Sequence, residues 1–433
     1  MIQTKGYSGP ERPADEDLAK CTRCGLCEQA CPTYRDLGVE ADSPRGRVFL
    51  MKQVADGETD ISAHLAEHLY LCLGCRACET ACPSGVPYGR LLEYARYQIE
   101  ERGELSPARR GWRGFRRVAF EQLLPNGRLF ALAMWPARLL QRFPGLAAFV
   151  RSLPMPRRAR NLLAMIPMTE RGARGGLPEV IPAEGVRRAR VGLFAGCVMS
   201  ALFGHVHEAM ARVLRHNGCE VIVPRGYRCC GALNVHAGER DIAKAMARDV
   251  IDAFAPFEVD AIVLNSAGCG AVMKEYGELL RHDEQYAERG VAFASKVKDI
   301  TEFLVELGVR DDFGKLAKRV TYQDACHLAH AQRVRRQPRK LLQSIPGLEY
   351  VEMQWADRCC GAAGVYSLTQ PEMSSRILAE KLDCIERTGA DIVALGNPGC
   401  HMQIQAGLMQ RGSSTQVRHL IEIVDDAYRA ASP

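Results

Sequence analysis

Apolar side chains recur at helical spacing in several segments near the N-terminus. These segments are Arg47–Val54, Ile61–Leu71 with apolar residues at 61, 65, 69 and 71, and Tyr88–Glu101. Apolar residues three or four positions apart form one face of an α-helix. Leu18–Ala30 has the pattern of a further short helix interrupted by a cysteine-rich turn, and residues 1–17 are polar, as in an arm. The pattern predicts an all-α domain over residues 1–101.

The C-terminal half has a different pattern, in which apolar runs end at a cysteine. The runs are Arg190–Cys197, Asp260–Cys269, Arg319–Cys326 and Asp391–Cys400. Helical segments are predicted at Leu202–Asn217, Glu239–Phe254 and Pro371–Thr388. A strand, a turn and a helix in succession are typical of α/β folds. Because ligands of open α/β sheets gather where strands end, we expect these cysteines to meet there.

The cysteines also show that this half is an internal repeat. Cys197 matches Cys326 at a separation of 129 residues, and Cys269 matches Cys400 at 131. Between them, Cys229-Cys230-Gly231 matches Cys359-Cys360-Gly361 at 130. The repeat predicts two tandem α/β domains, 189–312 and 313–433, and hence an α+β multidomain protein. Cys219 and Cys384 have no counterpart, and we interpret them as packing residues.

Residues 102–188 differ from both flanks in their charge. Residues 102–190 contain 18 Arg, 5 Glu and neither Lys nor Asp, whereas the whole chain has a net charge of only +6. Frequent prolines separate short apolar pieces, which predicts short amphipathic helices. We interpret the segment as a basic helical linker, with docking of an acidic partner or of an anionic membrane surface as alternatives. Nucleic acid is not expected, since no recognition motif accompanies the charge.

Eight cysteines of the first domain have the spacing of a two-cluster [4Fe–4S] ferredoxin. The run C-x2-C-x2-C-x3-C-P begins at Cys21 and again at Cys72. In such modules the fourth cysteine of each run ligates the cluster of the other run. The spacing therefore assigns Cys21, Cys24, Cys27 and Cys82 to cluster 1, and Cys72, Cys75, Cys78 and Cys31 to cluster 2. Zinc sites built from paired CxxC units need neither the third cysteine nor the Cys-Pro ending.

The chemistry of the repeat thiols stays open from the sequence. The candidates are Cys197, Cys229, Cys230 and Cys269 in one repeat, and Cys326, Cys359, Cys360 and Cys400 in the other. A further iron–sulfur cluster, another metal such as zinc, a redox-active dithiol and buried inert thiols are the alternatives. Their occurrence in two tandem sets argues against inert thiols. His327, His330 and His401 lie beside them as candidate ligands, hydrogen-bond donors or proton relays.

The composition favours a reducing compartment. The chain has 18 Cys in ligand-like spacings, and its N-terminus has no apolar signal core, so we expect a cytoplasmic protein. No apolar run is long enough to predict a membrane span. No GxGxxG follows a predicted strand, so the sequence has no flavin fingerprint, and it shows no catalytic site for a substrate. Arg45 and Arg47 either offset the charge of a thiolate-ligated cluster or are solvated.

Together these motifs resemble the iron–sulfur subunits of glycolate oxidases over nearly the whole chain. The resemblance rests on the ferredoxin runs, on Asp42-Ser-Pro-Arg-Gly-Arg47, and on Cys-Cys-Gly repeats with Asp324–His330 and Asn397–Cys400. Iron–sulfur subunits of anaerobic glycerol-3-phosphate dehydrogenase, lactate utilisation and heterodisulfide reductases have the same architecture. In heterodisulfide reductases the repeat ends in CxxC. Here Ser266 and Asn397 replace the first cysteine of that ending, which counts against a five-cysteine cluster.

The resemblance implies an electron-transfer subunit of an oxidoreductase complex, a glycolate dehydrogenase, that is not catalytic alone. Partner subunits would carry FAD and oxidise a 2-hydroxy acid such as glycolate. This subunit would pass electrons through two [4Fe–4S] clusters to a quinone-type acceptor, in peripheral contact with the inner face of the cell membrane. The rival interpretations are a thiol or heterodisulfide reductase-type catalytic subunit, and the iron–sulfur subunit of a glycerol-3-phosphate or lactate dehydrogenase complex.

Overall fold

The computed structural model describes residues 6–103 and 176–431, with short pieces between them at 111, 114, 117–123, 126, 129, 132–133 and 135. The chain divides into two compact units. Unit 1 consists of Met1–Gln122 with Gly231–Lys244, and unit 2 of Leu123–Cys230 with Ala245–Pro433. Most of the predicted basic linker 102–188 lies outside the described residues. Within it, Val180–Ile181 forms a strand, β1, where only helices were predicted.

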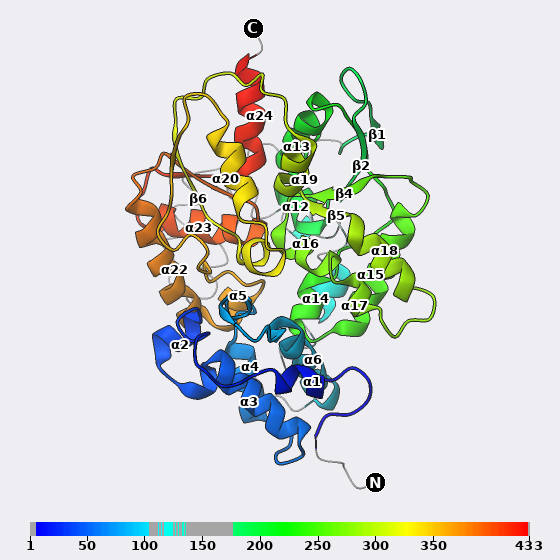
Figure 1. Ribbon diagram of the computed structural model, residues 1–433, viewed down its shortest axis with the longest axis vertical. Coiled ribbons are helices and arrows are strands. Elements are labelled where there is room, and N and C mark those ends of the chain that lie inside the picture. Colours follow the sequence, from blue (N-terminus) through cyan, green and yellow to red (C-terminus); the bar gives the residue numbers. More distant parts are fainter. Residues whose placement is uncertain are drawn as a thin grey trace. The chain divides into compact units, whose positions relative to one another are not determined.

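Unit 1 is helical in its described part, as predicted (residues 6–103 are blue to cyan and residues 231–244 green in Figure 1). Its elements are α1 (Asp15–Ala19), α2 (Pro32–Leu37), η1 (Glu40–Asp42), α3 (Pro44–Ala55), α4 (Ala63–Leu71), α5 (Ala77–Ala81), α6 (Tyr88–Arg102) and α14 (Ala232–Ala237), with the start of α15 (Arg240–Phe254). A short π-helix, η2 (Ala119–Leu123), follows α6 in the sequence. The helices predicted within 47–54, 61–71 and 88–101 are therefore confirmed.

Local signals explain where these helices begin and which face they bury. Ser43 caps α3 by accepting a hydrogen bond from the Gly46 N–H at 2.9 Å, and Ser62 caps α4 in the same way. Buried Val48, Met51 and Val54 lie on one face of α3 and pack in a core with apolar residues of α4 and α6. Helix packing therefore forms a small core next to the eight cysteines.

Of the helix predicted over Leu18–Ala30, the interruption by the cysteine turn is confirmed, but only Leu18 and Ala19 are helical. The helix ends at Ala19, and the chain then turns through the first three cysteines without helical structure. Arg23 and Gly25 have φ values of 60° and 82°, which a right-handed helix does not contain. The spacing of the thiols therefore overrides the apolar pattern in this stretch.

Residues 231–244 complete unit 1, although the sequence places them in the first repeat domain. Helix α14 packs on α6, and Arg96 donates from Nη1 to the carbonyl of His236 at 2.8 Å. Arg240 is buried and donates to Glu11 at 2.7 Å. The unit is therefore built from two stretches of chain that lie far apart in the sequence.

Unit 2 contains two sheets flanked by helices (green to red in Figure 1). The strands are β1 (Val180–Ile181), β2 (Ala189–Leu193), β3 (Cys219–Ile222), β4 (Ala261–Leu264), β5 (Val297–Asp299), β6 (Arg319–Tyr322), β7 (Glu349–Val351), β8 (Ile392–Leu395) and β9 (Gln416–His419). The orders are β1-β3-β2-β4-β5 and β7-β6-β8-β9. Only β1, which pairs with β3, runs antiparallel to its neighbour among these strands. The predicted α/β character of both repeats is confirmed.

Helices cover the two sheets of unit 2. They are α12 (Cys197–Leu202), α13 (Gly204–His216), α15, α16 (Ala267–Met273), α17 (Tyr276–Leu279), α18 (Ala287–Lys296), α19 (Ile300–Leu307), η3 (His327–Ala331), α20 (Arg336–Gln343), α21 (Tyr366–Thr369), α22 (Pro371–Glu386), α23 (Pro398–Gln410) and α24 (Leu420–Ala431). The strands β4 and β8 are buried at every position, as expected where helices cover a parallel sheet.

One apolar core serves both repeats. Helices α13 and α19 of the first repeat pack against α24 and α20 of the second. Buried Val191 and Val263 of the first sheet belong to the same cluster as Val320 and Ile392 of the second. The two repeats therefore form one packed body, although the sequence marks them as two units.

A helix that crosses a membrane needs about 20 consecutive, mostly apolar residues. Among the helices in the described part of the chain, none combines that length with that apolarity.

We expect Gly238→Ala to destabilise unit 1 much more than Gly57→Ala. Both glycines have positive φ, 84° and 74°. A Cβ on Gly238 would lie 2.7 Å from the Arg96 carbonyl oxygen, whereas a Cβ on Gly57 would have no atom within 4 Å. The left-handed conformation costs ~1–2 kcal/mol at either site, and overpacking adds ~1–3 kcal/mol at Gly238 only. Anaerobic calorimetry of both variants measures the difference, and equal losses would contradict the packing of α14 on α6.

Candidate iron–sulfur sites

The first thiol group consists of Cys21, Cys24, Cys27 and Cys82. All four line one surface pocket, together with Cys78 of the second run and residues of α3 such as Arg45 and Val48. Burial, assisted by the neighbouring thiols of Cys21 and Cys82, raises the pKa of Cys27 to about 11. The structure thus brings the first three cysteines of one run next to the last cysteine of the other. Cys24 is exposed and the other three are partly buried.

The second thiol group consists of Cys31, Cys72, Cys75 and Cys78. All four are buried. Burial raises the pKa of Cys78 well above its usual value, and negative neighbours add to the shift. Those neighbours are Cys75, Cys72, Glu79 and Cys31. Each run therefore contributes its fourth cysteine to the group formed by the other run, the arrangement that the spacing predicts.

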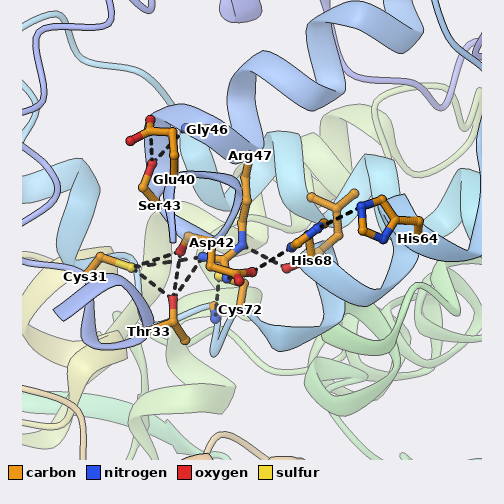
Figure 2. Close-up of polar contacts among 12 residues, drawn as sticks. Cys31, Thr33, Glu40, Asp42, Ser43, Gly46, Arg47, His64, His68 and Cys72 are labelled. Carbon is orange, nitrogen blue, oxygen red and sulfur yellow. Dashed lines mark hydrogen bonds and ion pairs between the residues drawn. The ribbon is translucent and has the colours of Figure 1, made fainter. Parts of the chain in front are cut away.

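Hydrogen-bond donors surround the sulfur atoms of the second group. Cys72 Sγ accepts from the Gly74 N–H at 3.3 Å and from the Tyr88 hydroxyl at 3.5 Å. Cys31 Sγ lies 3.2 Å from Thr33 Oγ1 and 4.0 Å from Arg47 Nη1 (Figure 2). Four convergent thiols with such donors fit an iron–sulfur cluster, whose ligands are thiolates stabilised by hydrogen bonds to sulfur.

The two arginines of the Ser-Pro-Arg-Gly-Arg motif lie in different environments. Arg47 is fully buried beside Cys31 and bonds Asp42, Thr33 and the carbonyl of His68 (Figure 2). Arg45 is partly exposed and pairs with acidic side chains. The sequence left open whether these cations offset cluster charge or are solvated. Arg47 is a buried cation beside a thiol, and Arg45 is a partly exposed cation paired with carboxylates.

The first repeat site consists of Cys197, Cys229, Cys230 and Cys269. Cys197 Sγ and Cys229 Sγ lie 3.4 Å apart. The hydrogen bonds that Cys230 makes with Cys229 and Cys269, and its burial, raise the pKa of Cys230 well above its usual value. The four thiols come from the N-terminus of α12, the loop after β3, and α16. They therefore lie together beyond the ends of the strands.

The second repeat site consists of Cys326, Cys359, Cys360 and Cys400, which also lie together. Cys359 forms hydrogen bonds with Cys326 and Cys360, and Cys360 forms one with Cys400. Hydrogen bonds with Cys359 and Cys400 lower the pKa of Cys360 well below its usual value, and the nearby Lys381 adds to this effect. A hydrogen bond with Cys359 likewise lowers the pKa of Cys326, with His327 adding to it.

Cationic and polar side chains distinguish the second repeat site from the first. Lys381 of α22 is buried and donates from Nζ to the carbonyls of Trp355 at 2.7 Å and Ala356 at 3.2 Å. At the repeat spacing of 130 residues, Ile251 stands in its place in the first repeat. Asn397 Nδ2 donates to Cys400 Sγ at 3.6 Å. Sequence reasoning missed Lys381, and the break of the repeat at this position was the signal that could have found it.

The histidines near the repeat thiols are placed differently from one another. His327 Nδ1 lies 3.6 Å from Cys326 Sγ. His330 bonds the carbonyl of Asp357 and the guanidinium of Arg335. Burial lowers the pKa of His401 to about 3, and its ring packs 4.9 Å from that of Phe203. Of the three candidates, His327 therefore has the geometry to donate to a thiolate.

Comparison with known proteins adds family matches to this geometry. The "4Fe-4S dicluster domain" family matches residues 17–86, and the "Cysteine-rich domain" family matches residues 191–274 and 320–405. The chain is 40% identical over 431 residues to the "Probable glycolate oxidase iron-sulfur subunit" of Bacillus subtilis (strain 168), covering 96% of this chain and 95% of that protein. The chain belongs to the family of glycolate oxidase iron–sulfur subunits.

Further relatives differ in how much of the chain they match. The "Glycolate oxidase iron-sulfur subunit" of Escherichia coli (strain K12) is 32% identical over 430 residues, which are 96% of this chain and 95% of that protein. The "Lactate utilization protein A" of Shouchella clausii (strain KSM-K16) is 32% identical over 236 residues, which are 54% of this chain and 98% of that protein. The predicted family, the fold class and the iron–sulfur electron-transfer role are confirmed.

We expect Cys31→Ser to damage the cluster of the second thiol group and to leave that of the first in place. Cys31 belongs to the first run in sequence but lies with Cys72, Cys75 and Cys78. Cys24→Ser is the matched control, because Cys24 lines the pocket of the first group. Electron paramagnetic resonance (EPR) spectra of reduced protein distinguish the two losses.

Iron analysis accompanies these spectra. Two cubane clusters correspond to roughly eight iron atoms per chain, and each substitution should remove up to about four. If Cys31→Ser removed only the first cluster's signal, the exchange of fourth cysteines between the runs would be contradicted.

Proposed function

We propose that this protein is the iron–sulfur electron-transfer subunit of a flavin-dependent glycolate dehydrogenase complex. The observation that carries the proposal is the exchange of Cys31 and Cys82 between the two thiol groups. We assign the first group to one [4Fe–4S] cluster and the second group to the other. When bound, such clusters supply one-electron carriers, which link a two-electron flavin reaction to a stepwise acceptor.

The chain's own residues hold and insulate these carriers. The second group is buried among apolar residues of α3, α4 and α6, which exclude water from the sulfur atoms. The first group opens to the surface at Cys24, which gives a redox partner access to this edge. We assign oxidation of the substrate to an FAD-bearing partner subunit, because the sequence lacks a flavin fingerprint.

The extent of the matches favours glycolate over lactate. The relatives named for glycolate oxidase match 96% of this chain, so they share both the dicluster domain and the two cysteine-rich domains. The relative named for lactate utilisation matches 54% of it. A quinone-type acceptor would complete the reaction.

We further propose that the repeat thiols hold an additional iron–sulfur cluster or another metal, and that the second repeat site is the stronger candidate. Thiolates are the form that binds metals, and cations nearby favour thiolates. At the second site Lys381 lies near Cys360, and His327 Nδ1 lies 3.6 Å from Cys326 Sγ. In the first repeat, Ile251 stands in the place of Lys381. Wild-type iron clearly above roughly eight atoms per chain would support this assignment.

We place the protein in the cytoplasm, since its many thiols need a reducing compartment. The strongly basic residues 102–190 would provide peripheral contact with the anionic inner face of the cell membrane, or with an acidic partner. Either contact would bring the subunit close to its electron acceptor.

Reconstitution of the complex from separately purified subunits tests the proposal. With this subunit present, glycolate should reduce a quinone analogue. Omitting the subunit, or replacing it with the Cys24→Ser variant, should lower the rate at least tenfold. Lactate and glycerol 3-phosphate serve as competing substrates. Wild-type rates without this subunit would contradict the electron-transfer role, and rapid disulfide reduction by the isolated chain would favour the reductase alternative.

A further inference from the structure

The two thiol groups of unit 1 differ in their distance from solvent. The cysteines of the second group are each at most 9% exposed, whereas Cys24 of the first group is exposed. Reduction adds negative charge to a thiolate-ligated cluster, and burial disfavours added charge. Burial alone would therefore make the second cluster the harder one to reduce.

A buried cation opposes this effect at the second group. The side chain of Arg47 has no exposed surface, and its Nη1 lies 4.0 Å from Cys31 Sγ (Figure 2). An arginine keeps its charge in the interior, where a charge acts about fourfold more strongly than in water. The cation is thus close to the sulfur and is not screened by solvent.

Three hydrogen bonds fix the direction of this guanidinium. Nη1 donates to Thr33 Oγ1 at 3.1 Å, and Nε donates to the carbonyl of His68 at 2.8 Å. Nη2 pairs with Asp42 Oδ1 at 3.2 Å, so the counter-charge binds a different nitrogen from the one nearest Cys31. The same Asp42 oxygen also lies 2.9 Å from His68 Nδ1. The positive end of the ion pair therefore faces the thiol.

Arg45, two residues earlier in α3, provides a natural comparison. It lines the pocket of the first thiol group, but its side chain is 31% exposed. It lies 2.6 Å from Glu28 and 2.7 Å from Glu40. Water and two carboxylates screen its charge, so its effect on the first group is small.

We propose that Arg47 is a fixed positive charge that raises the reduction potential of the cluster in the second thiol group above that of the cluster in the first. This inference rests on the proposed function, since it takes the eight thiols as cluster ligands. Arg47 contacts neither substrate nor partner, and its charge acts on the reduction potential of the cluster. An electron held by unit 1 then resides mainly on the cluster of the buried second group. The negative charge of Asp42 partly cancels that of Arg47 and so limits the difference between the two reduction potentials.

Redox titration of the purified full-length protein, followed by EPR, measures the two potentials directly. The signals are assigned with the Cys24→Ser and Cys31→Ser variants. In Arg47→Gln, the ratio of reduced to oxidised second cluster at a fixed potential should fall at least tenfold, or ~59 mV for a one-electron couple. The first cluster should be unchanged. In Arg47→Lys, the ratio of reduced to oxidised second cluster should return to most of its wild-type value. In Arg45→Gln, the same ratio should stay within about threefold of wild type.

Asp42→Asn should shift the reduction potential of the second cluster in the opposite direction to Arg47→Gln. Removing the counter-charge should raise the ratio for the second cluster, whereas a purely structural role of the motif would shift both variants in the same direction. If Arg47→Gln fails to assemble the cluster, Arg47→Lys and Asp42→Asn still decide the question. An unchanged or lowered ratio in Asp42→Asn, or an unchanged ratio in fully loaded Arg47→Gln, overturns the proposal.

The titration uses chemical mediators and needs neither partner nor substrate. A wild-type chain that held no clusters would contradict the proposed function. A wild-type chain with two clusters, of which the second has the lower potential or does not respond to substitution of Arg47, would contradict only the present inference.

Discussion

Eight cysteine thiols have to share two small volumes within unit 1, and each volume needs one thiol from the other run. This requirement decides the path of the chain between Cys31 and Cys72. Helices α2, α3 and α4 have to return the second run to the first, and their apolar faces form the core that supports both. The turn at Cys21–Cys27 gives up helical structure for the same reason. Local helix propensity is a weak preference, and the geometry that brings the sulfur atoms together overrides it.

Thiolates that ligate a cluster would concentrate negative charge, and donors from several elements lie where they would stabilise that charge. Backbone N–H groups, Tyr88 and Arg47 all lie against the sulfur atoms of the buried group. In unit 2, Lys381 and His327 lie near the thiols of the second repeat site in the same way. The two repeats share one core and one plan, yet their thiol sites have different surroundings. The two repeats therefore share a scaffold, and single differences such as Lys381 in one and Ile251 in the other distinguish their thiol sites.

Periodicity and spacing were sufficient to predict much of this arrangement. Helical spacing located α3, α4 and α6, and the cysteine spacing located the repeat and the exchange of Cys31 and Cys82. The burial of Arg47 was not predictable, because a sequence does not show which of two nearby arginines turns inward. The packing of residues 231–244 on α6 was also missed, since it joins distant segments through Arg96 and Gly238. The spacing of apolar residues within one segment does not predict contacts between segments that lie far apart in the sequence.

In the proposed complex, electrons from the substrate pass through the clusters held by the thiol groups of this chain. Rapid mixing of the anaerobic complex with glycolate, followed by freezing and EPR, follows this transfer. Reduced-cluster signals should appear at least as fast as steady-state turnover, with the larger share of the reduced signal at the second group. Clusters that stay oxidised while turnover proceeds, or that become reduced more slowly than turnover, would contradict it.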